Sequence, residues 1–151
     1  EEIQKYNQRI KETIELIPEK LTNKEKDPAR ESIMIVEDNK EMNDYLASIF
    51  SEKYDIIRAY NGAEACKKIA KQLPNLIISD LMMPVMDGLT ATKAIRAMYR
   101  PDAKTIPILA MTAQDAREAA QECKDAGMND YLAKPVDPDR MAEKILHWTR
   151  Q

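Results

Sequence analysis

The chain has 151 residues, of which 44% are hydrophobic and 32% charged, a composition that suits one domain with a short appendage. Its formal net charge is -3, so no basic field attracts it to nucleic acid or to a membrane surface. No signal peptide is visible in the sequence, and no apolar run approaches the ~20 residues that a membrane-spanning helix needs. We therefore expect a cytoplasmic chain that neither binds nucleic acid directly nor inserts into a membrane. Cys66 and Cys123 lie in helical patterns, and we expect them to be inert buried thiols in a reducing cytosol.

The first 31 residues differ in pattern from the rest. The sequence begins at Glu1 rather than at a methionine, so we expect a fragment or a processed chain. The a and d positions of a heptad are occupied by Ile3, Tyr6, Ile10, Thr13 and Ile17. Pro18 ends this pattern, and the charged stretch "EKLTNKEKDPARE" follows. The segment fits a coiled-coil or signalling helix from an upstream module, or a linker helix that is marginal alone; the linker is the simpler interpretation.

From Ser32 onward, short apolar runs alternate with helical patterns. The strands that we expect are, in chain order, "SIMIV", "YDIIRAY", "NLIIS", "IPILAM" and "DYLA". The first helix should bury one face, formed by Met42, Tyr45, Leu46, Ile49 and Phe50. Further helices are expected over "NGAEACKKIAKQL", from 88 to about 100, over 116–126, and after Asp137, where Met141, Ile145 and Trp148 share one face.

Local residues mark several helix ends. Asn61 and Asp137 are expected N-caps, with Pro138 at the first position of the last helix. Gly127 should end the helix over 116–126. Either Asp38 or Asn39 could cap the first helix.

Five strands alternating with five helices predict an α/β fold, in which a parallel sheet is covered by helices on both faces. The site of such a sheet lies beyond the carboxyl ends of its strands. The polar side chains expected there are Glu37, Asp38, Asp80, Thr112 and Lys134. Each alone could be a cap, a loop residue or a solvated charge, but three clustered carboxylates repel one another unless a cation neutralises them. A site that offers a few oxygen ligands from the protein and leaves the other positions to water molecules suits Mg²⁺.

These groups also suit phosphoryl transfer. One carboxylate can be the nucleophile that takes a phosphoryl group as an acyl phosphate. Lys134 and the metal would neutralise charge on the phosphoryl oxygens, and Thr112 could donate a hydrogen bond to one of them.

The motifs "VEDN", "SDLMMPVMDG", "MTA" and "AKP" occur in order, one at each of four expected strand ends. In combination they resemble the receiver domain of two-component response regulators, from about Ser32 to Trp148. The resemblance implies a flavodoxin-like, doubly wound, five-stranded parallel sheet with strand order 2-1-3-4-5. It implies that 32–150 form the receiver domain, with 1–31 as a helical or charged linker. It further implies a phosphorelay, in which a histidine kinase or a histidine phosphotransfer domain phosphorylates the receiver and switches its conformation.

The same resemblance assigns roles to single residues. It makes Asp80 the phospho-acceptor, and it implies that Mg²⁺ is held by Glu37, Asp38, Asp80 and the backbone carbonyl of Met82. It makes Thr112 the switch hydroxyl, Tyr131 the rotating aromatic and Lys134 the lysine that contacts phosphate. It implies a cis peptide between Lys134 and Pro135, and it places Pro84 and Gly88 in the loop at the pocket rim. Receivers catalyse their own Mg²⁺-dependent phosphorylation and dephosphorylation. Met82 and Gln114 occupy the two positions whose residues set the rate of dephosphorylation in the family.

Several alternatives remain open. "AMTAQD" and "AKPVDPDRM" are most similar to receivers of hybrid sensor histidine kinases, but a stand-alone receiver or one from a DNA-binding response regulator would share them. A flavodoxin-type cofactor protein shares the fold, yet the acidic "VEDNKE" would repel the phosphate of FMN. A dehalogenase-type phosphatase would need an aspartate general acid where Met82 stands.

Overall fold

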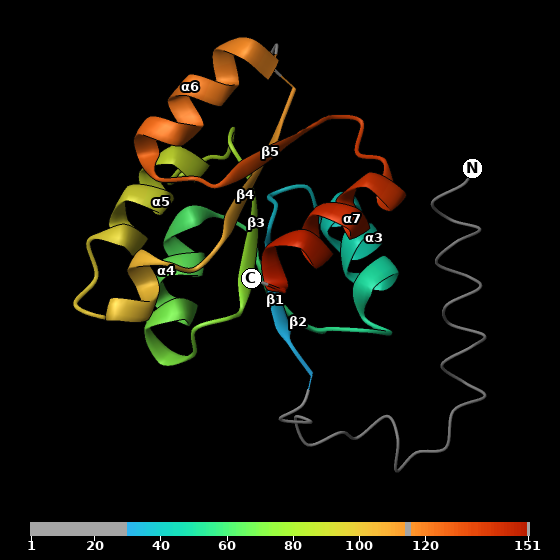
Figure 1. Cartoon of the computed structure of the whole chain (residues 1–151), viewed down its shortest axis with the longest axis horizontal. Helices are drawn as coiled ribbons and strands as arrows, with labels where there is room; N and C mark the ends of the chain where they lie inside the picture. The colour runs from blue at the N-terminus through green and yellow to red at the C-terminus, as the bar shows by residue number, and fades with distance from the viewer. Residues whose placement is uncertain (1–29, 114–115, 151) are drawn as a thin grey trace.

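Five parallel strands form the centre of the computed structural model, which describes residues 30–113 and 116–150 (Figure 1). The strands are β1 (Ser32–Val36), β2 (Asp55–Ala59), β3 (Leu76–Asp80), β4 (Ile108–Thr112) and β5 (Asp130–Ala133). Their order in the sheet is β2-β1-β3-β4-β5, and all pairs are parallel. The predicted fold class and strand order are therefore confirmed.

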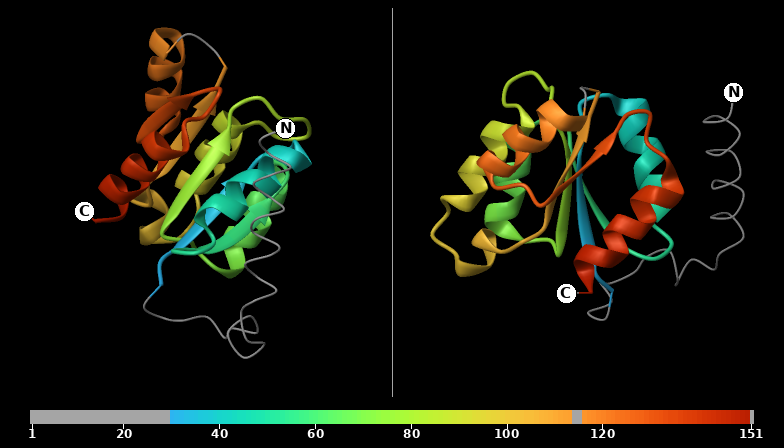
Figure 2. Two further views of the ribbon diagram at one scale, coloured as in Figure 1. Left: turned by 90° about the vertical axis from the view of Figure 1, so that its right-hand side faces the viewer. Right: turned by 45° about the horizontal axis from the view of Figure 1, so that its top comes forward.

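Within the described part of the chain, five α-helices cover the two faces of this sheet. They are α3 (Lys40–Phe50), α4 (Gly62–Lys71), α5 (Gly88–Arg96), α6 (Ala116–Ala126) and α7 (Pro138–Thr149), with a short 3-10 helix η1 (Pro101–Lys104) after α5. Figure 1 views the sheet nearly edge-on, with α4, α5 and α6 on one side and α3 and α7 on the other, and Figure 2 shows the same division. No helix within 30–113 and 116–150 is long and apolar enough to cross a membrane.

Each face of the sheet has its own hydrophobic core. Successive side chains of a strand point to opposite faces, so Ile33 and Ile35 of β1 pack toward α3 and α7, whereas Met34 and Val36 pack toward α4, α5 and α6. β3 and β4 are buried along their whole length, as expected for central strands of a sheet covered on both faces. The core thus fixes β3, and with it Asp80, in the middle of the fold.

The predicted caps and the end of α6 agree with the structure, but two helices end earlier than predicted, one of them α4, which ends at Lys71 rather than Leu73. Asn61 and Asp137 cap α4 and α7, Pro138 opens α7, and Gly127 follows α6 with a positive φ of 104°. α5 ends at Arg96 rather than near residue 100, because Arg100 precedes Pro101 and is extended.

The heptad pattern of the N-terminal segment and Gln114 lie outside the described residues. Cys66 is half-buried, Cys123 is buried, and both are free thiols. Burial raises the pKa of both thiols, and Glu122 adds to the effect at Cys123, which favours the unreactive protonated form.

Candidate functional site

The carboxyl ends of the strands bring three acidic residues together at one edge of the sheet. Glu37 and Asp38 follow β1, and Asp80 is the last residue of β3, the neighbour of β1. One carboxylate oxygen from each of the three lies within 4.8 Å of the others. Glu37 and Asp80 are 1% and 6% exposed, and Asp38 is exposed to solvent. This is the acidic cluster that the strand-end pattern predicts.

Lys134 bridges two members of the acidic cluster. Its Nζ lies 2.9 Å from Oδ2 of Asp80 and 3.0 Å from Oε1 of Glu37. Burial opposes the charged form of the ammonium, but the two carboxylates outweigh it and raise the pKa of Lys134. The backbone N–H of Lys134 donates to the carbonyl of Thr112 at 2.8 Å, and the Lys134–Pro135 peptide is cis, as predicted. Lys134 is thus a permanent cation inside the acidic cluster.

Glu37 is held from both its side chain and its backbone. Burial raises the pKa of its carboxyl to about 7, while the N–H of Asn39 and the Lys134 ammonium act in the opposite direction and Asp38 and Asp80 reinforce the rise. Oε2 of Glu37 accepts from the Asn39 N–H at 3.1 Å, and its carbonyl accepts from Nδ2 of Asn43 at 3.0 Å. Asn39 also caps α3 through Met42 N, so of the two candidate caps Asn39 has this role. Asp38 does not cap α3 and is a member of the acidic cluster.

The loop between β3 and α5 packs closely around Asp80. The N–H of Met82 donates to Oδ1 of Asp80 at 3.3 Å, and the side chain of Met82 is exposed. Gly88 begins α5, and a Cβ at this position would lie 2.4 Å from the carbonyl oxygen of Asp80. Val85 in the same loop has a φ of 71°, which is rare for a β-branched residue and is typical of strained functional loops. Of the predicted rim residues, Pro84 lies in this loop and Gly88 lies where the loop meets α5, next to the backbone of Asp80.

Thr112 lies on β4, the neighbour of β3, and Tyr131 lies on β5, the strand beyond β4. Thr112 ends β4 and is buried, and Met111, just before it, is the Cα partner of Asp80. Tyr131 of β5 pairs with Ala110 of β4, is half-buried, and packs against the core below α4, α5 and α6. A path of adjacent residues therefore leads from Asp80 through β4 to Tyr131.

Asn43 is a residue of the site that the sequence pattern did not single out. Its Nδ2 donates to the carbonyls of Glu37 and Ala59, at 3.0 and 3.1 Å, and its Oδ1 accepts from Nε of Arg58 at 2.8 Å. Asn43 is fully buried together with Leu46 and Phe50. The sequence did hold a signal for this residue, because Asn43 lies on the same helix face as the apolar Leu46 and Phe50. An amide that is buried on such a face must form hydrogen bonds with other buried groups.

The donor set fits a hard divalent cation. Three carboxylates with one ammonium leave a local excess of negative charge when all are ionised, and carboxylate oxygens are preferred ligands of Mg²⁺. The buried carboxylate of Asp80 beside a lysine also has the chemistry of a nucleophile for phosphoryl groups.

Comparisons with known proteins agree with this geometry. Residues 33–146 match the family model of the response regulator receiver domain. One curated relative is the CAI-1 autoinducer sensor kinase/phosphatase CqsS of Vibrio cholerae, which is 31% identical over 77% of this chain and 17% of its own length. Another is the hybrid signal transduction protein dokA of Dictyostelium discoideum, which is 35% identical over 89% of this chain and 8% of its own length. This chain therefore spans only a small part of these two relatives.

Solved structures of response regulators and receiver domains are also similar to this chain. A putative response regulator from Chloroflexus aurantiacus has a TM-score of 0.75 and 34% identity, covering 81% of this chain and 99% of its own. The receiver domain of a sensor histidine kinase from Pseudomonas aeruginosa, solved with a magnesium ion in its active site cleft, has a TM-score of 0.74 and 31% identity, covering 82% and 100%. The chain belongs to the family of response regulator receiver domains of two-component systems.

Proposed function

We propose that Asp80 accepts a phosphoryl group from a phosphohistidine, carried by a histidine kinase or by a histidine phosphotransfer domain. The observation that carries this proposal is the position of the Asp80 carboxylate, which is buried at a strand end, 2.9 Å from the Lys134 ammonium and clustered with Glu37 and Asp38. Of the three acids, Asp80 has the most rigid support, because the fully buried strand β3 carries it.

The transfer forms one bond and breaks another. An oxygen of Asp80 attacks phosphorus, the O–P bond of an acyl phosphate forms, and the N–P bond of the donor breaks. The donor imidazole keeps the electron pair of that bond and is protonated from solvent. Lys134 stays close to the new phosphoryl oxygens and offsets their charge, and Thr112 can donate a hydrogen bond to one of them.

Glu37, Asp38, Asp80 and the backbone carbonyl of Met82 would hold Mg²⁺. The ion would supply the charge neutralisation that three carboxylates and a phosphoryl group require. The Pseudomonas relative, whose structure has magnesium in the active site cleft, supports this ligand chemistry.

Phosphorylation then shifts the domain between two packings. Thr112 moves toward the phosphoryl oxygens, and the space that it leaves admits the ring of Tyr131. This alters the surface formed by α6, β5 and α7. Thr112 and Tyr131 are thus the switch residues of the proposal, and the site also hydrolyses its own acyl phosphate.

The wider context is proposed by similarity. Residues 1–31 would be a helical or charged linker and 32–150 the receiver domain of a cytoplasmic part of a hybrid histidine kinase. The sensor kinase/phosphatase CqsS and the hybrid signal transduction protein dokA, both named above, support this context. A stand-alone receiver and a receiver from a DNA-binding regulator are the alternatives, which the flanking sequence of the parent gene would distinguish.

Acetyl phosphate, a small phosphoryl donor, tests the acceptor. We expect the intact mass of the chain to increase by one phosphoryl group when donor and Mg²⁺ are present. Asp80→Asn should not be labelled, whereas the matched control Asp87→Asn should be, because asparagine can still cap α5 as Asp87 does. Equal labelling of Asp80→Asn and the parent chain would exclude Asp80 as the acceptor.

A further inference from the structure

An apolar groove lies between α3 and α7, on the face of the sheet opposite α4, α5 and α6. Its volume is about 470 Å³. Ile49, Phe50 and Tyr54 line it from the end of α3 and the turn that follows, and Ala142 and Leu146 line it from α7. Leu146 is 42% exposed, one of the few large hydrophobic residues of the described chain that is open to solvent. The groove is therefore an apolar surface that has no cover from residues 30–113 and 116–150.

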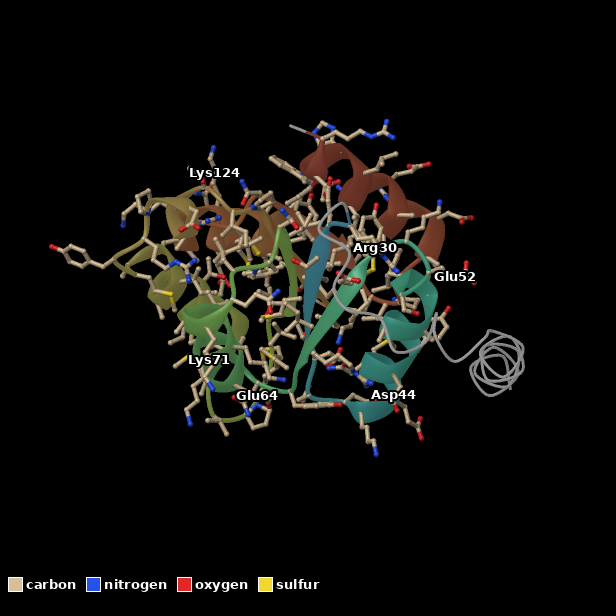
Figure 3. The ribbon with its side chains drawn as sticks, turned by 90° about the horizontal axis from the view of Figure 1, so that it is seen from below. Arg30, Asp44, Glu52, Glu64, Lys71 and Lys124 are labelled. Atoms are coloured by element: carbon tan, nitrogen blue, oxygen red, sulfur yellow. The ribbon has the colours of Figure 1, made fainter. Side chains whose placement is uncertain are left out.

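The N-terminal segment enters the domain beside this groove. Nη2 of Arg30 donates to the carbonyl of Ser51 at 2.7 Å, and Nε of Arg30 lies 3.6 Å from Oδ1 of Asp55. Ser51 directly follows α3 and precedes Glu52, which lines the groove. Figure 3 shows Arg30 and Glu52 on the same side of the molecule. Arg30, where the described part of the chain begins, is thus fixed at one end of the groove.

The sequence of that segment offers a matching apolar stripe. Ile3, Tyr6, Ile10 and Ile17 recur at the spacing of one helix face, and Gln8 falls on the opposite face. A helix over 3–17 would be about 22 Å long, compared with about 18 Å for α7. Residues 18–29 can extend to about 40 Å, which is enough to bring the stripe to any part of the groove.

We propose that the groove between α3 and α7 binds the apolar stripe of residues 3–17 of the same chain. This interaction is separate from the phosphoryl-transfer site and does not depend on it. It would couple the linker, and whatever precedes it in a longer protein, to the position of the receiver domain.

Charge complementarity favours this occupant. The rim of the groove carries Glu52, Asp139 and Glu143 against one basic residue, Lys53. Residues 3–17 carry three basic side chains, Lys5, Arg9 and Lys11, all within 3–11, and two acidic ones, Glu12 and Glu15, in the last turns. Basic side chains that flank an apolar stripe can reach acidic groups at a groove rim while their stems cover apolar surface.

Amide NMR spectra of the full chain test the proposal. Ile10→Asp places a charge in the stripe, and we expect it to shift the amide resonances of groove residues such as Lys53, Ala142 and Leu146. Gln8→Asp introduces the same residue on the opposite face and should leave those resonances in place. From the other side, Ala142→Arg should shift the amides of 3–17, with an unchanged unfolding midpoint as proof that the domain is intact.

Two results would overturn the proposal. The first is an Ile10→Asp spectrum in which the groove amides coincide with those of the parent chain. The second is a doubled molar mass in light scattering, with groove shifts that depend on protein concentration, because the segment would then bind a second copy.

Discussion

At the scale of single residues, the balance of charge around Lys134 governs the site. One ammonium contacts two buried carboxylates while a third lies within the same cluster. Replacing it with methionine leaves the buried acids without a cation, and we expect the free energy of unfolding to fall by about 1–3 kcal/mol without divalent ions. Because the cluster then has more negative charge, Mg²⁺ should raise the unfolding midpoint more in Lys134→Met than in the parent chain. Thermal unfolding with and without Mg²⁺ measures both effects.

Lys124→Met is the matched control for this prediction. Lys124 is an exposed lysine in the last turn of α6, the end of the helix farther along the chain from the carboxyl end of β4, and it is labelled in Figure 3. Its replacement should change neither the midpoint nor the response to Mg²⁺. A Lys134→Met chain that behaves like this control would show that the bridge contributes nothing.

Asp130 gives a second prediction at the residue scale, with a defined pH dependence. Burial opposes its charged form, but Lys144, Trp148 and the N–H of Tyr131 outweigh burial and lower the pKa of its carboxyl below the ordinary value of 3.8. Because the pKa is lowered, the charged form of Asp130, which pairs with Lys144, stabilises the fold fully above pH 3.8. This stabilisation is lost as the pH falls through the lower pKa of the folded state. We expect Asp130→Asn to cost about 1 kcal/mol near neutral pH.

Urea unfolding at neutral and at acidic pH measures this effect. The difference between Asp130→Asn and the parent chain should begin to shrink when the pH falls below 3.8, where the unfolded chain binds a proton, and it should vanish below the folded-state pKa, where the carboxyl is protonated in both states. Glu122→Gln, which neutralises an exposed acid on α6, is the control. A difference that does not change with pH would mean that packing, rather than charge, is responsible.

At the scale of elements, the contact between β3 and the start of α5 fixes the loop around Asp80. A Cβ on Gly88 would approach the Asp80 carbonyl to 2.4 Å, so one of the two backbones must move. We expect Gly88→Ala to lower the free energy of unfolding by about 1–3 kcal/mol, as overpacking does. It should also reduce labelling by acetyl phosphate. Thr90→Ala, at an exposed position of the same helix, should do neither.

Most of these elements could be predicted because their local signals agree with their packing. "SIMIV" and "DYLA" coincide with β1 and β5, and the caps of α4 and α7 were readable because a side chain binds a nearby backbone N–H. The end of α5 could not be placed, because the residues after Arg96 continue the helical pattern of the sequence to about residue 100, although Arg100 before Pro101 has an extended backbone. The register of the strands depends on tertiary packing and also needed the structure.

At the scale of the whole molecule, the proposed switch connects the site to the surface around Trp148. This residue is the only tryptophan of the chain, and its Nε1 donates to Oδ2 of Asp130 at 3.0 Å. Oδ1 of Asp130 accepts from the N–H of Tyr131 at 2.8 Å. Acetyl phosphate with Mg²⁺ should therefore change the fluorescence of Trp148 in the parent chain and leave it unchanged in Asp80→Asn. An equal change in fluorescence in both chains would show that Trp148 does not respond to phosphorylation of Asp80.

The candidate site was readable from the sequence for a reason that belongs to the whole fold. A parallel sheet carries the ends of distant strands to one edge, so Asp38, Asp80 and Lys134 could be grouped before any contact was known. The partners within the group could not be predicted, since the contact of Lys134 with Glu37 depends on side-chain packing. Asn43 was missed because an isolated asparagine in a helix usually points to solvent, and only the structure shows its buried partners.

Chemical trapping of the acyl phosphate tests the central claim, that Asp80 is the residue that receives the phosphoryl group. The chain is incubated with acetyl phosphate and Mg²⁺ and reduced with borohydride, which converts a phosphorylated aspartate to homoserine, and its peptides are then sequenced by mass spectrometry. We predict homoserine at Asp80 alone, and none when Mg²⁺ is removed by a chelator. Homoserine at Asp38 in place of Asp80, or no conversion in the peptide that contains Asp80, would contradict the account.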